Sequence, residues 1–221
     1  MKNSYDLFGE ALRAYLHGDK SKFYFEDKQG DKFEQSISWY FDKNKSFTKL
    51  ERKIISLSKG RILDIGCGTG NFIPSLMKKG KVLGVDISPR MIKICKNRGF
   101  KNVRVADIFK LKLKDKFDTI ALLDENIGLA GTIENTKKLL KKLSSLLSLN
   151  GQILANVEDV KKDYVIWEAR CTWKKKHGPW FKWIKFNSKF LIKLCEKQGL
   201  KAQIIKRDKP RYIIKIQNSK P

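Results

Sequence analysis

Short apolar runs alternate with amphipathic segments through the middle of the chain, beginning at Gly60. Apolar residues that recur every three or four positions predict helices, and compact runs rich in Val, Ile and Leu predict buried strands. The expected helices cover residues 72–79, 89–97 and 132–147, and the expected strands cover residues 61–65, 81–86, 103–106, 117–123 and 152–157. This alternation predicts an α/β fold with a doubly wound, mostly parallel sheet.

Further elements are expected on both sides of this alternating region. Before Gly60, helices are expected at residues 4–17 and 46–58. Between them, the Gly30-Asp31 turn predicts either a short hairpin or a loop. After the fifth strand, two extended runs around a Lys-rich turn at 174–179 predict a β-hairpin insertion. The insertion, a helix and two final strands are expected at about residues 160–187, 188–198, 201–206 and 212–217.

Charge changes this picture, because the 221 residues carry a formal net charge of +25. Residues 161–221 hold 18 basic and 4 acidic side chains, a net charge of +14. Such an excess favours contact with a polyanion, an anionic membrane or an anionic substrate. A Lys-rich composition that covers solvated faces explains the same excess equally well.

Several classes of protein are not expected from the composition. The chain has no apolar run near the ~20 residues of a membrane span, and its first residues have no apolar signal-peptide core. The chain has four cysteines, at Cys67, Cys95, Cys171 and Cys195. They show no CxxC motif and no metal-ligand spacing with the two histidines. We therefore expect reduced thiols, a cytoplasmic location and no metal site.

Chemistry is concentrated in the glycine-rich turn from Asp64 to Gly70, which follows a strand and opens a helix. Gly66 and Gly68 allow a tight turn and a close approach of the backbone to a ligand. The next expected strand ends in Asp86, 20 residues after Gly66, where a carboxylate can accept both ribose hydroxyls of an adenosine. Three successive strands end near an acid: Asp64, Asp86 and Asp107. Together these acids indicate a nucleoside site more strongly than they indicate helix caps.

The spacing of this turn distinguishes between adenosine compounds. A dinucleotide turn reads GxGxxG and holds a pyrophosphate at the helix N-terminus. This turn reads GxGxG, and Asp64 lies two residues before its first glycine. A carboxylate in that position would repel pyrophosphate and suits a cation, such as the ammonium group of an amino acid.

The ordered set of motifs resembles the class I S-adenosylmethionine-dependent methyltransferases. The stretch from Ile62 to Gly70 is similar to their first motif, and that from Val82 to Ile92 to their second. Shorter matches follow at residues 106–108, 117–120 and 147–154, where Asn150-Gly151 replaces the usual Pro-Gly-Gly. The resemblance implies a seven-stranded sheet of order 3-2-1-4-5-7-6, with strand 7 antiparallel. It covers about residues 60–157.

The resemblance also implies a cofactor and a division of the chain. The cofactor would be S-adenosylmethionine, bound by Asp64, Gly66, Cys67, Gly68, Gly70, Asp86, Ile87, Asp107, Ile108 and Asp124. Asp64 would lie at its methionine part, Asp86 at its ribose, and Asp107 with Ile108 at its adenine. Residues 60–221 would form the Rossmann-like methyltransferase domain, and residues 1–59 an N-terminal lid or cover segment.

The sequence signals for residues that would act on the methyl acceptor are less specific than those for the cofactor. The Asn/Asp-Pro-Pro-Tyr/Phe and Pro-Cys motifs of nucleic-acid methyltransferases are absent after the fourth expected strand, where Asp124 and Glu125 lie instead. Either acid could serve as a general base, grip an acceptor cation, contact the cofactor or cap the next helix. His177 is a further candidate base, although a single histidine in a turn is typical of plain surface.

Two aromatic segments border the expected acceptor pocket. The first would either fold over the cofactor as a lid or pack beneath the N-terminal helices, and includes Tyr5, Trp39, Tyr40 and Phe41. The insertion interleaves Trp and Phe with Lys and Arg between Tyr164 and Phe186. That mixture suits bases and phosphates, and it suits even better a hairpin whose aromatics pack on the sheet while its lysines face water.

Three functions are compatible with these features. The first is a methyltransferase that acts on a small-molecule acceptor, an anionic one being suggested by the charge. The second is an RNA methyltransferase that uses the basic, aromatic C-terminal region. The third is a non-catalytic interaction protein that binds the cofactor, against which the intact set of carboxylates argues.

Overall fold

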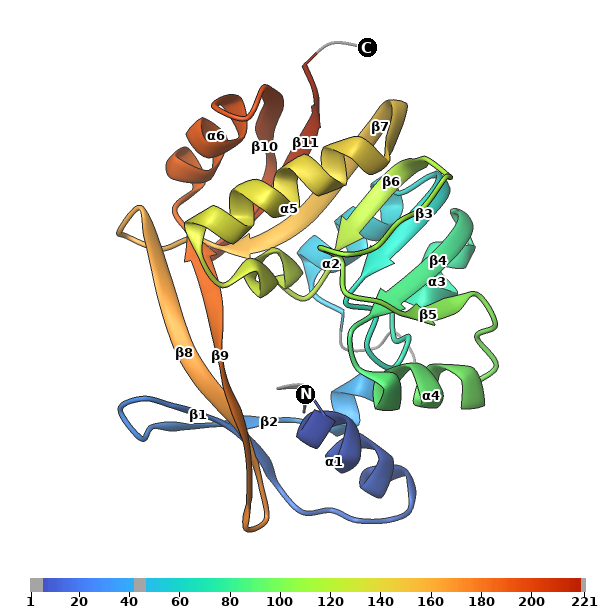
Figure 1. The fold of residues 1–221 in the computed structure, drawn as a ribbon, viewed down its shortest axis with the longest axis vertical. Coiled ribbons are helices and arrows are strands. Elements are labelled where there is room, and N and C mark those ends of the chain that lie inside the picture. The colour runs from blue at the N-terminus through green and yellow to red at the C-terminus, as the bar shows by residue number, and fades with distance from the viewer. Residues whose placement is uncertain (1–5, 42–46, 220–221) are drawn as a thin grey trace.

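The computed structural model describes residues 6–41 and 47–219, and its central element is a seven-stranded sheet of order β10-β11-β7-β6-β3-β4-β5 (Figure 1). Strand β11 is antiparallel to both neighbours, and the remaining pairs are parallel. The predicted order, 3-2-1-4-5-7-6, is therefore confirmed. The strands are β3 (Gly60–Ile65), β4 (Gly80–Asp86), β5 (Val103–Val105), β6 (Phe117–Leu122), β7 (Leu147–Glu158), β10 (Leu200–Asp208) and β11 (Arg211–Asn218).

Helices cover both faces of this sheet, as a doubly wound fold requires. One face packs on α2 (Lys49–Leu57), α3 (Ile73–Met77) and α4 (Pro89–Asn97), and the other on α5 (Ile133–Leu146) and α6 (Ser188–Glu196). Neighbouring residues of one strand accordingly enter different cores. Ile62 packs with the first group of helices, and Leu63 packs with the second.

Local sequence signals explain where the helices begin. Thr48 and Glu51 form a reciprocal capping box at the start of α2, in which each side chain accepts a hydrogen bond from the other residue's backbone N–H. Ser88 caps α4 ahead of Pro89, and Thr132 caps α5. These caps bound the helices within a few residues of the predicted limits.

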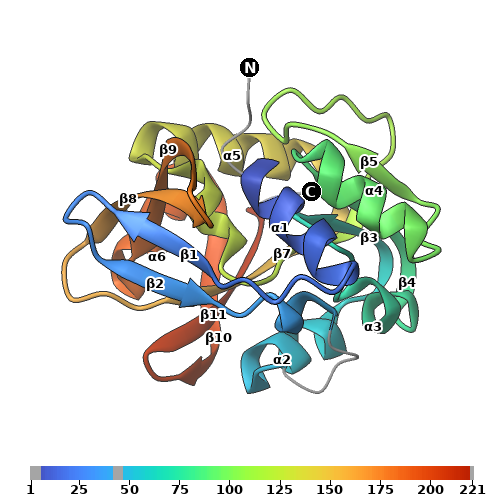
Figure 2. The same cartoon turned by 90° about the horizontal axis from the view of Figure 1, so that it is seen from below.

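A second, antiparallel sheet of order β2-β1-β8-β9 lies below the first (Figures 1 and 2). It joins the N-terminal hairpin to the insertion, which are far apart in the chain. Strand β1 pairs with β2 on one side and with β8 on the other, so that Phe25 lies opposite both Phe33 and Cys171. Its strands are β1 (Phe23–Asp27), β2 (Lys32–Gln35), β8 (Tyr164–Trp173) and β9 (Lys176–Phe186).

The second sheet selects the hairpin, one of the two alternatives expected in the N-terminal cover, and corrects the expected turn of the insertion. The N-terminal cover contains a β-hairpin in addition to its helix, α1 (Asp6–Leu16), and the turn η1 (Ser38–Phe41). The turn of the insertion is only Lys174-Lys175, because β9 already begins at Lys176. Pro179 is accommodated there because β9 is an edge strand of this sheet. The aromatics of the insertion divide: Phe186 is buried in the core of the seven-stranded sheet, whereas Trp173 and Phe181 pack with residues of the N-terminal cover.

Helix α1 connects the two sheets. Its residues Phe8 and Leu12 share a small core with Phe23, from the second sheet, and with Met91 and Ile94, from α4. Gly9 allows close packing of α1 on α4, since a Cβ atom there would lie 2.7 Å from the Cβ of Arg90. The cover is thus attached to the wall of the seven-stranded domain.

Three further expectations concern single residues or short segments. All four cysteines are free and buried. Within residues 6–41 and 47–219, none of the helices combines the length and the apolar character needed to cross a membrane. Tyr5, expected in the lid, and Ser46, the expected start of the second helix, lie outside the described residues.

Candidate active site

A cavity of about 840 Å³ lies between the C-terminal ends of the central parallel strands and one face of the second sheet. Its floor comes from the ends of β3, β4 and β6, at Gly66, Asp86 and Asp124. Its roof carries the aromatic side chains Phe25, Phe33, Trp167, Phe181 and Trp183. The position, at the carboxyl ends of the strands, is where open α/β sheets bind ligands, and the volume lies within the usual range of ligand pockets.

The glycine-rich turn forms one edge of this cavity. Gly66 and Gly68 have φ values of 70° and 54°, which L side chains rarely adopt. The backbone N–H groups of Gly66 and Cys67 donate to the carbonyl of Val85 over 2.9 and 3.0 Å. These bonds fix the turn against the end of β4 and leave Gly66 and Gly68 on the cavity wall.

Asp86 supports the same turn from the end of β4. Its carboxylate accepts hydrogen bonds from the N–H groups of Gly68, at 2.9 Å, and Ser88, at 2.8 Å. Burial raises the pKa of Asp86, and these backbone donors oppose the rise. The carboxylate also lines the cavity, so its remaining lone pairs can accept hydroxyl groups of a ligand.

Asp64 is the most deeply buried acid beside the turn, with 1% of its surface exposed. Its Oδ2 atom has no hydrogen-bond partner among the described residues. Burial, with a smaller contribution from the nearby Asp86, raises the pKa of Asp64 to about 7. A carboxylate oxygen buried without a partner costs free energy, and a cationic group placed beside the turn would offset that cost.

The other predicted cofactor residues divide into two groups. Ile87, Asp107 and Ile108 line the cavity beyond the ends of β4 and β5, where Asp107 accepts the N–H of Phe109 at 2.9 Å. Cys67 and Gly70 are absent from the cavity lining. Cys67 packs behind the turn against Gly84, and a Cβ at Gly70 would lie within 3 Å of Cys95 and Phe100. Asp64 is likewise absent from the lining, so direct contact of Asp64, Cys67 and Gly70 with a ligand stays a prediction.

Asp124 and Glu125 follow β6 with φ values of 54° and 60°, in the left-handed region. Asp124 lines the main cavity and also a smaller one of about 360 Å³, so its accessible surface faces these cavities. Asp124 is exposed toward these cavities, yet desolvation by the surrounding protein raises its pKa to about 7. Glu51 and Glu125 add to the rise, and Arg211 opposes it. Glu125 forms an ion pair with Arg211.

The structure does not bring His177 into this site. Its Nδ1 atom lies 3.4 Å from Thr172 Oγ1 and 3.7 Å from Glu26 Oε2. Side chains alternate between the faces of a strand, so Glu26 points away from the face that carries Phe25. His177 therefore lies on the opposite side of the second sheet from the cavity, and its role as a base stays a prediction without support there.

Asn126 and Gly128 make contacts in the site that could not be predicted from the sequence. The side-chain amide of Asn126 donates to the carbonyls of Ile65, at 3.0 Å, and Gly66, at 3.1 Å. It therefore holds the glycine-rich turn from the end of β6. A Cβ at Gly128, within η2 (Asn126–Ala130), would lie only 2.1 Å from Trp183 Nε1. The sequence holds no local signal for either contact.

The N-terminal cover is tied to the same turn. Thr69 Oγ1 donates to the carbonyl of Tyr40 at 2.6 Å, and Asn71 Nδ2 donates to that of Trp39 at 2.9 Å. Tyr40 lines the cavity, whereas Phe41 stacks on Tyr15. The aromatic stretch of the cover thus contributes to both the cavity and the packing beneath it.

Comparison with known proteins gives this geometry a context. A family model described as "Methyltransferase domain" matches residues 56–213. An uncharacterised protein of Methanocaldococcus jannaschii is 34% identical over 131 residues, 58% of this chain and 60% of that protein. This chain spans about half the length of the curated relatives it matches.

Solved structures extend the likeness to nearly the whole chain. A methyltransferase from Bacteroides fragilis, described as S-adenosylmethionine-dependent and in complex with S-adenosylhomocysteine, has a TM-score of 0.88 and 26% identity. The match covers 99% of this chain and 97% of that one, including the cover and the insertion. A sugar N-methyltransferase from Streptoalloteichus, at 15% identity and a TM-score of 0.64, shares the fold over 86% of this chain and 95% of its own.

Proposed function

The chain belongs to the methyltransferase-domain family, and from that premise we propose that it transfers a methyl group from S-adenosylmethionine to a small molecule held in the main cavity. The family and the structural likeness support S-adenosylmethionine as the methyl donor. When bound, that cofactor supplies a methyl group activated by a positively charged sulfur. The acceptor and the roles of single residues are the proposed part.

The residues around the glycine-rich turn fit such a cofactor. The unpartnered oxygen of Asp64 suits the ammonium group of the methionine part. Asp86 has lone pairs at the cavity for the ribose hydroxyls, and Gly66 and Gly68 leave room for close approach. Asp107 and Ile108 would hold the adenine, the first as an acceptor for its amino group and the second as an apolar cover.

The observation that carries the proposal is the enclosure of the cavity by the second sheet. Its volume of about 840 Å³ accommodates a nucleoside cofactor together with one small acceptor. The roof would keep water away from the reacting atoms and hold the acceptor in line with the methyl group. The contribution of the second sheet to the reaction is therefore positioning and the exclusion of solvent.

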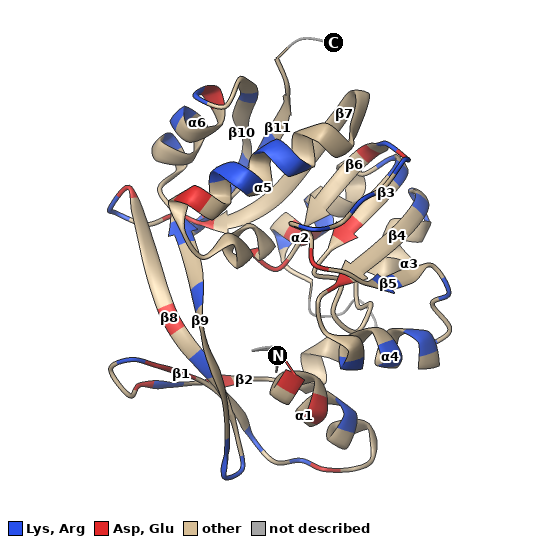
Figure 3. Cartoon of the chain, in the orientation of Figure 1, with Lys and Arg blue, Asp and Glu red and all other residues tan. Residues whose placement is uncertain are grey.

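An RNA acceptor stays a prediction that no feature of the cavity favours. Most lysines and arginines lie along the outer strands, helices and loops (Figure 3). Among the described residues, Lys185 and Arg211 are the only cations that line the cavity, and each forms an ion pair with a glutamate. A purely cofactor-binding role is disfavoured because the enzyme family and the full set of carboxylates are both present.

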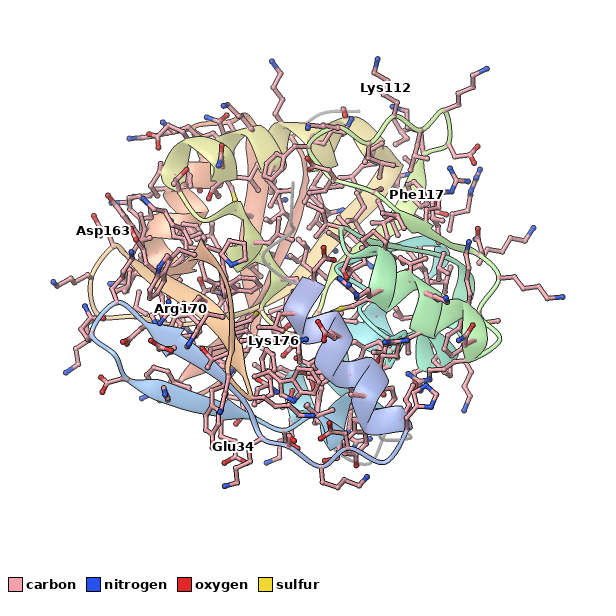
Figure 4. The ribbon with its side chains drawn as sticks, turned by 60° about the horizontal axis from the view of Figure 1, so that its bottom comes forward. Glu34, Lys112, Phe117, Asp163, Arg170 and Lys176 are labelled. Atoms are coloured by element: carbon pink, nitrogen blue, oxygen red, sulfur yellow. The ribbon has the colours of Figure 1, made fainter. Side chains whose placement is uncertain are left out.

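Labelled cofactor tests this function directly. The purified chain would be incubated with methyl-labelled S-adenosylmethionine and, separately, with a small-metabolite extract and with total RNA. We expect label to enter the small-molecule fraction and not the RNA. Asp86→Asn should abolish the incorporation, whereas Asp163→Asn, on the exposed outer loop before β8, should not (Figure 4). Label in RNA alone would overturn the proposal.

A further inference from the structure

The charges that line the main cavity are predominantly negative, although the chain as a whole is strongly basic. The cavity carries five carboxylates, Asp27, Asp86, Asp107, Asp124 and Glu125, against two cations, Lys185 and Arg211. Lys185 Nζ lies 2.7 Å from Glu158 Oε2, and Arg211 pairs with Glu125. Among the described residues that line the cavity, neither cation is left unpaired for an anionic acceptor.

Four of the five carboxylates are already engaged. Asp86 and Asp107 accept backbone N–H groups at the cofactor end of the cavity. Asp27 Oδ1 accepts the N–H groups of Gln29, at 2.9 Å, and Asp31, at 3.0 Å, which closes the β1–β2 turn. Glu125 is held by Arg211.

Asp124 differs from these four carboxylates. Among the described residues it has no hydrogen-bond or ion-pair partner, and its accessible surface faces the cavities. It follows β6, the strand beside β3, and β3 leads into the glycine-rich turn, so Asp124 lies next to the expected cofactor. Its φ of 54° and the φ of 60° at Glu125 are unfavourable for L side chains. Strained backbone of this kind concentrates at functional sites.

The roof opposite these strand ends is aromatic. Phe25, Trp167 and Phe181 meet edge to face, with ring centroids 6.0 to 6.4 Å apart, and Phe33 adds to the group. Rings and a carboxylate together suit a cationic group on an apolar body, because ring faces attract cations and apolar contact is gained as well.

We propose, as an extension of the function proposed above, that the methyl acceptor is a small amine with an apolar body, bound as its ammonium form between Asp124 and the aromatic roof. Asp124 then acts as both the anchor and the proton acceptor for the amine. This assignment replaces the anionic acceptor that the net charge suggested.

The proposed step balances in atoms and charge. The ammonium nitrogen gives one proton to the Asp124 carboxylate, which frees its lone pair. That lone pair forms the new N–C bond to the donor methyl group while the electrons of the S–C bond pass to sulfur, which leaves a neutral thioether. The products are a methylated ammonium ion and a protonated Asp124, whose proton then passes to water.

Desolvation by the surrounding protein is consistent with this role: it raises the pKa of Asp124 to about 7, although the residue is exposed where it faces the cavities. The charged groups around it are Glu51 on α2, Glu125 beside it and Arg211 on β11. Below pH 7 a protonated Asp124 neither pairs with an ammonium ion nor takes its proton. Turnover of an amine should therefore rise with pH through about 7, and Asp124→Asn should remove that dependence.

Matched probes provide the test. Calorimetry with saturating S-adenosylhomocysteine would compare sets that share one apolar body: 2-phenylethylamine, 2-phenylethanol and 3-phenylpropanoate, with shorter, longer and aliphatic analogues of each. Amines should bind about 10- to 100-fold more tightly than the matched acids, the difference expected for one charge-assisted hydrogen bond. Methylated product from the best amine would be measured by mass spectrometry across pH 6 to 8.

Asp124→Asn is the informative variant because Asn tolerates the left-handed backbone of Asp124. It should lower amine affinity about tenfold or more and lose methyl transfer. S-adenosylhomocysteine at saturating concentration separates this loss from any change in cofactor binding. Asp163→Asn is the control (Figure 4). The inference is wrong if no amine exceeds its matched acid or alcohol, or if Asp124→Asn binds amines normally. Failure to bind S-adenosylhomocysteine would instead contradict the proposed function itself.

Discussion

At the residue scale, Asp64 opposes the stability of the empty fold and favours ligand binding. Its pKa is raised from 3.8 to about 7, with one oxygen unpartnered. An acid whose pKa is higher in the folded than in the unfolded chain stabilises the fold at low pH. That contribution is lost as the pH rises from about 4 through about 7. Residues that serve a ligand at such a cost are typical of functional sites.

We predict that Asp64→Asn stabilises the empty protein at pH 8 by about 1–3 kcal/mol, because the amide removes a buried, unpartnered charge. At pH 5, where Asp64 is protonated in the folded chain, the gain should be small. Thermal unfolding at the two pH values measures both effects. Equal destabilisation by Asp64→Asn at the two pH values would show that ionisation of Asp64 does not lower the stability of the fold.

The same residue should make cofactor affinity depend on pH. An ammonium group bound beside Asp64 needs the ionised carboxylate, so affinity for S-adenosylhomocysteine should rise about tenfold between pH 6 and pH 8. Titration calorimetry at several pH values measures this rise. Asp64→Asn should bind more weakly and with most of the pH dependence removed. An affinity that falls toward pH 8 in the unmodified chain would contradict this role.

Asn126 is a positioning residue for the glycine-rich turn. Removal of its two hydrogen bonds to the carbonyls of Ile65 and Gly66 should weaken S-adenosylhomocysteine binding by about 1–2 kcal/mol, or about 5- to 30-fold. Calorimetry on Asn126→Ala checks this, with Asn97→Ala, at the exposed end of α4, as the matched control. Equal affinities in the two variants would show that the turn holds itself.

At the scale of elements, the alternation of strands and helices could be predicted because its signals are local, and the order of the seven strands followed from the family resemblance. The glycine-rich turn, the Pro89 helix start and the caps at Ser88 and Thr132 all act within a few residues. The second sheet could not be predicted, because β1 and β8 are about 140 residues apart and short alternating strands do not specify a partner. Without that pairing, the sequence does not determine which face of the second sheet carries Trp167 and which carries Trp180.

The two faces of the second sheet predict different consequences for two tryptophans. Trp167 lines the cavity, whereas Trp180, 38% exposed, stacks with Lys28 and Arg170 on the other face. Trp167→Ala should lower kcat/KM for the acceptor at least about tenfold, and Trp180→Ala should change it less than about threefold. Steady-state kinetics measures both, with S-adenosylhomocysteine affinity unchanged in each. The reverse order of effects would place the acceptor elsewhere.

The contacts missed at the site have the same physical cause. Asp86 and Asp107 were predictable because strand ends of a parallel sheet meet at one edge. Asn126, Arg211 and Trp183 act through residues distant in sequence, so their partners follow only from the assembled fold. His177 was a candidate on residue type alone, and a register shift between β8 and β9 places it beside Thr172 and Glu26, on the face away from the cavity.

At the scale of the whole molecule, charge is divided between exterior and interior. Lysines and arginines lie along the outer helices, strands and loops (Figure 3). Acids predominate among the charged residues that line the cavity. The net charge of +25 is therefore no guide to the acceptor. It leaves the exterior available for weak contacts with polyanions, independently of the chemistry in the cavity.

This division predicts a weak dependence of turnover on salt. With a small acceptor, kcat/KM should change less than about threefold between 50 and 200 mM salt, because no phosphate contacts are needed. An RNA acceptor held through 6–10 phosphates would lose about 10³- to 10⁵-fold in affinity over that range. Kinetics at several salt concentrations separates the two cases. A steep loss of turnover would return RNA to consideration.

The most direct test of the account is a calorimetric titration of the purified chain with S-adenosylhomocysteine. The account predicts one equivalent bound per chain. Asp86→Asn should bind at least about tenfold more weakly, because a charged acceptor at the cavity is lost. Thermal unfolding would establish that both proteins are folded. A folded, unmodified chain that binds no S-adenosylhomocysteine would contradict the central claim that this cavity holds the methyl donor.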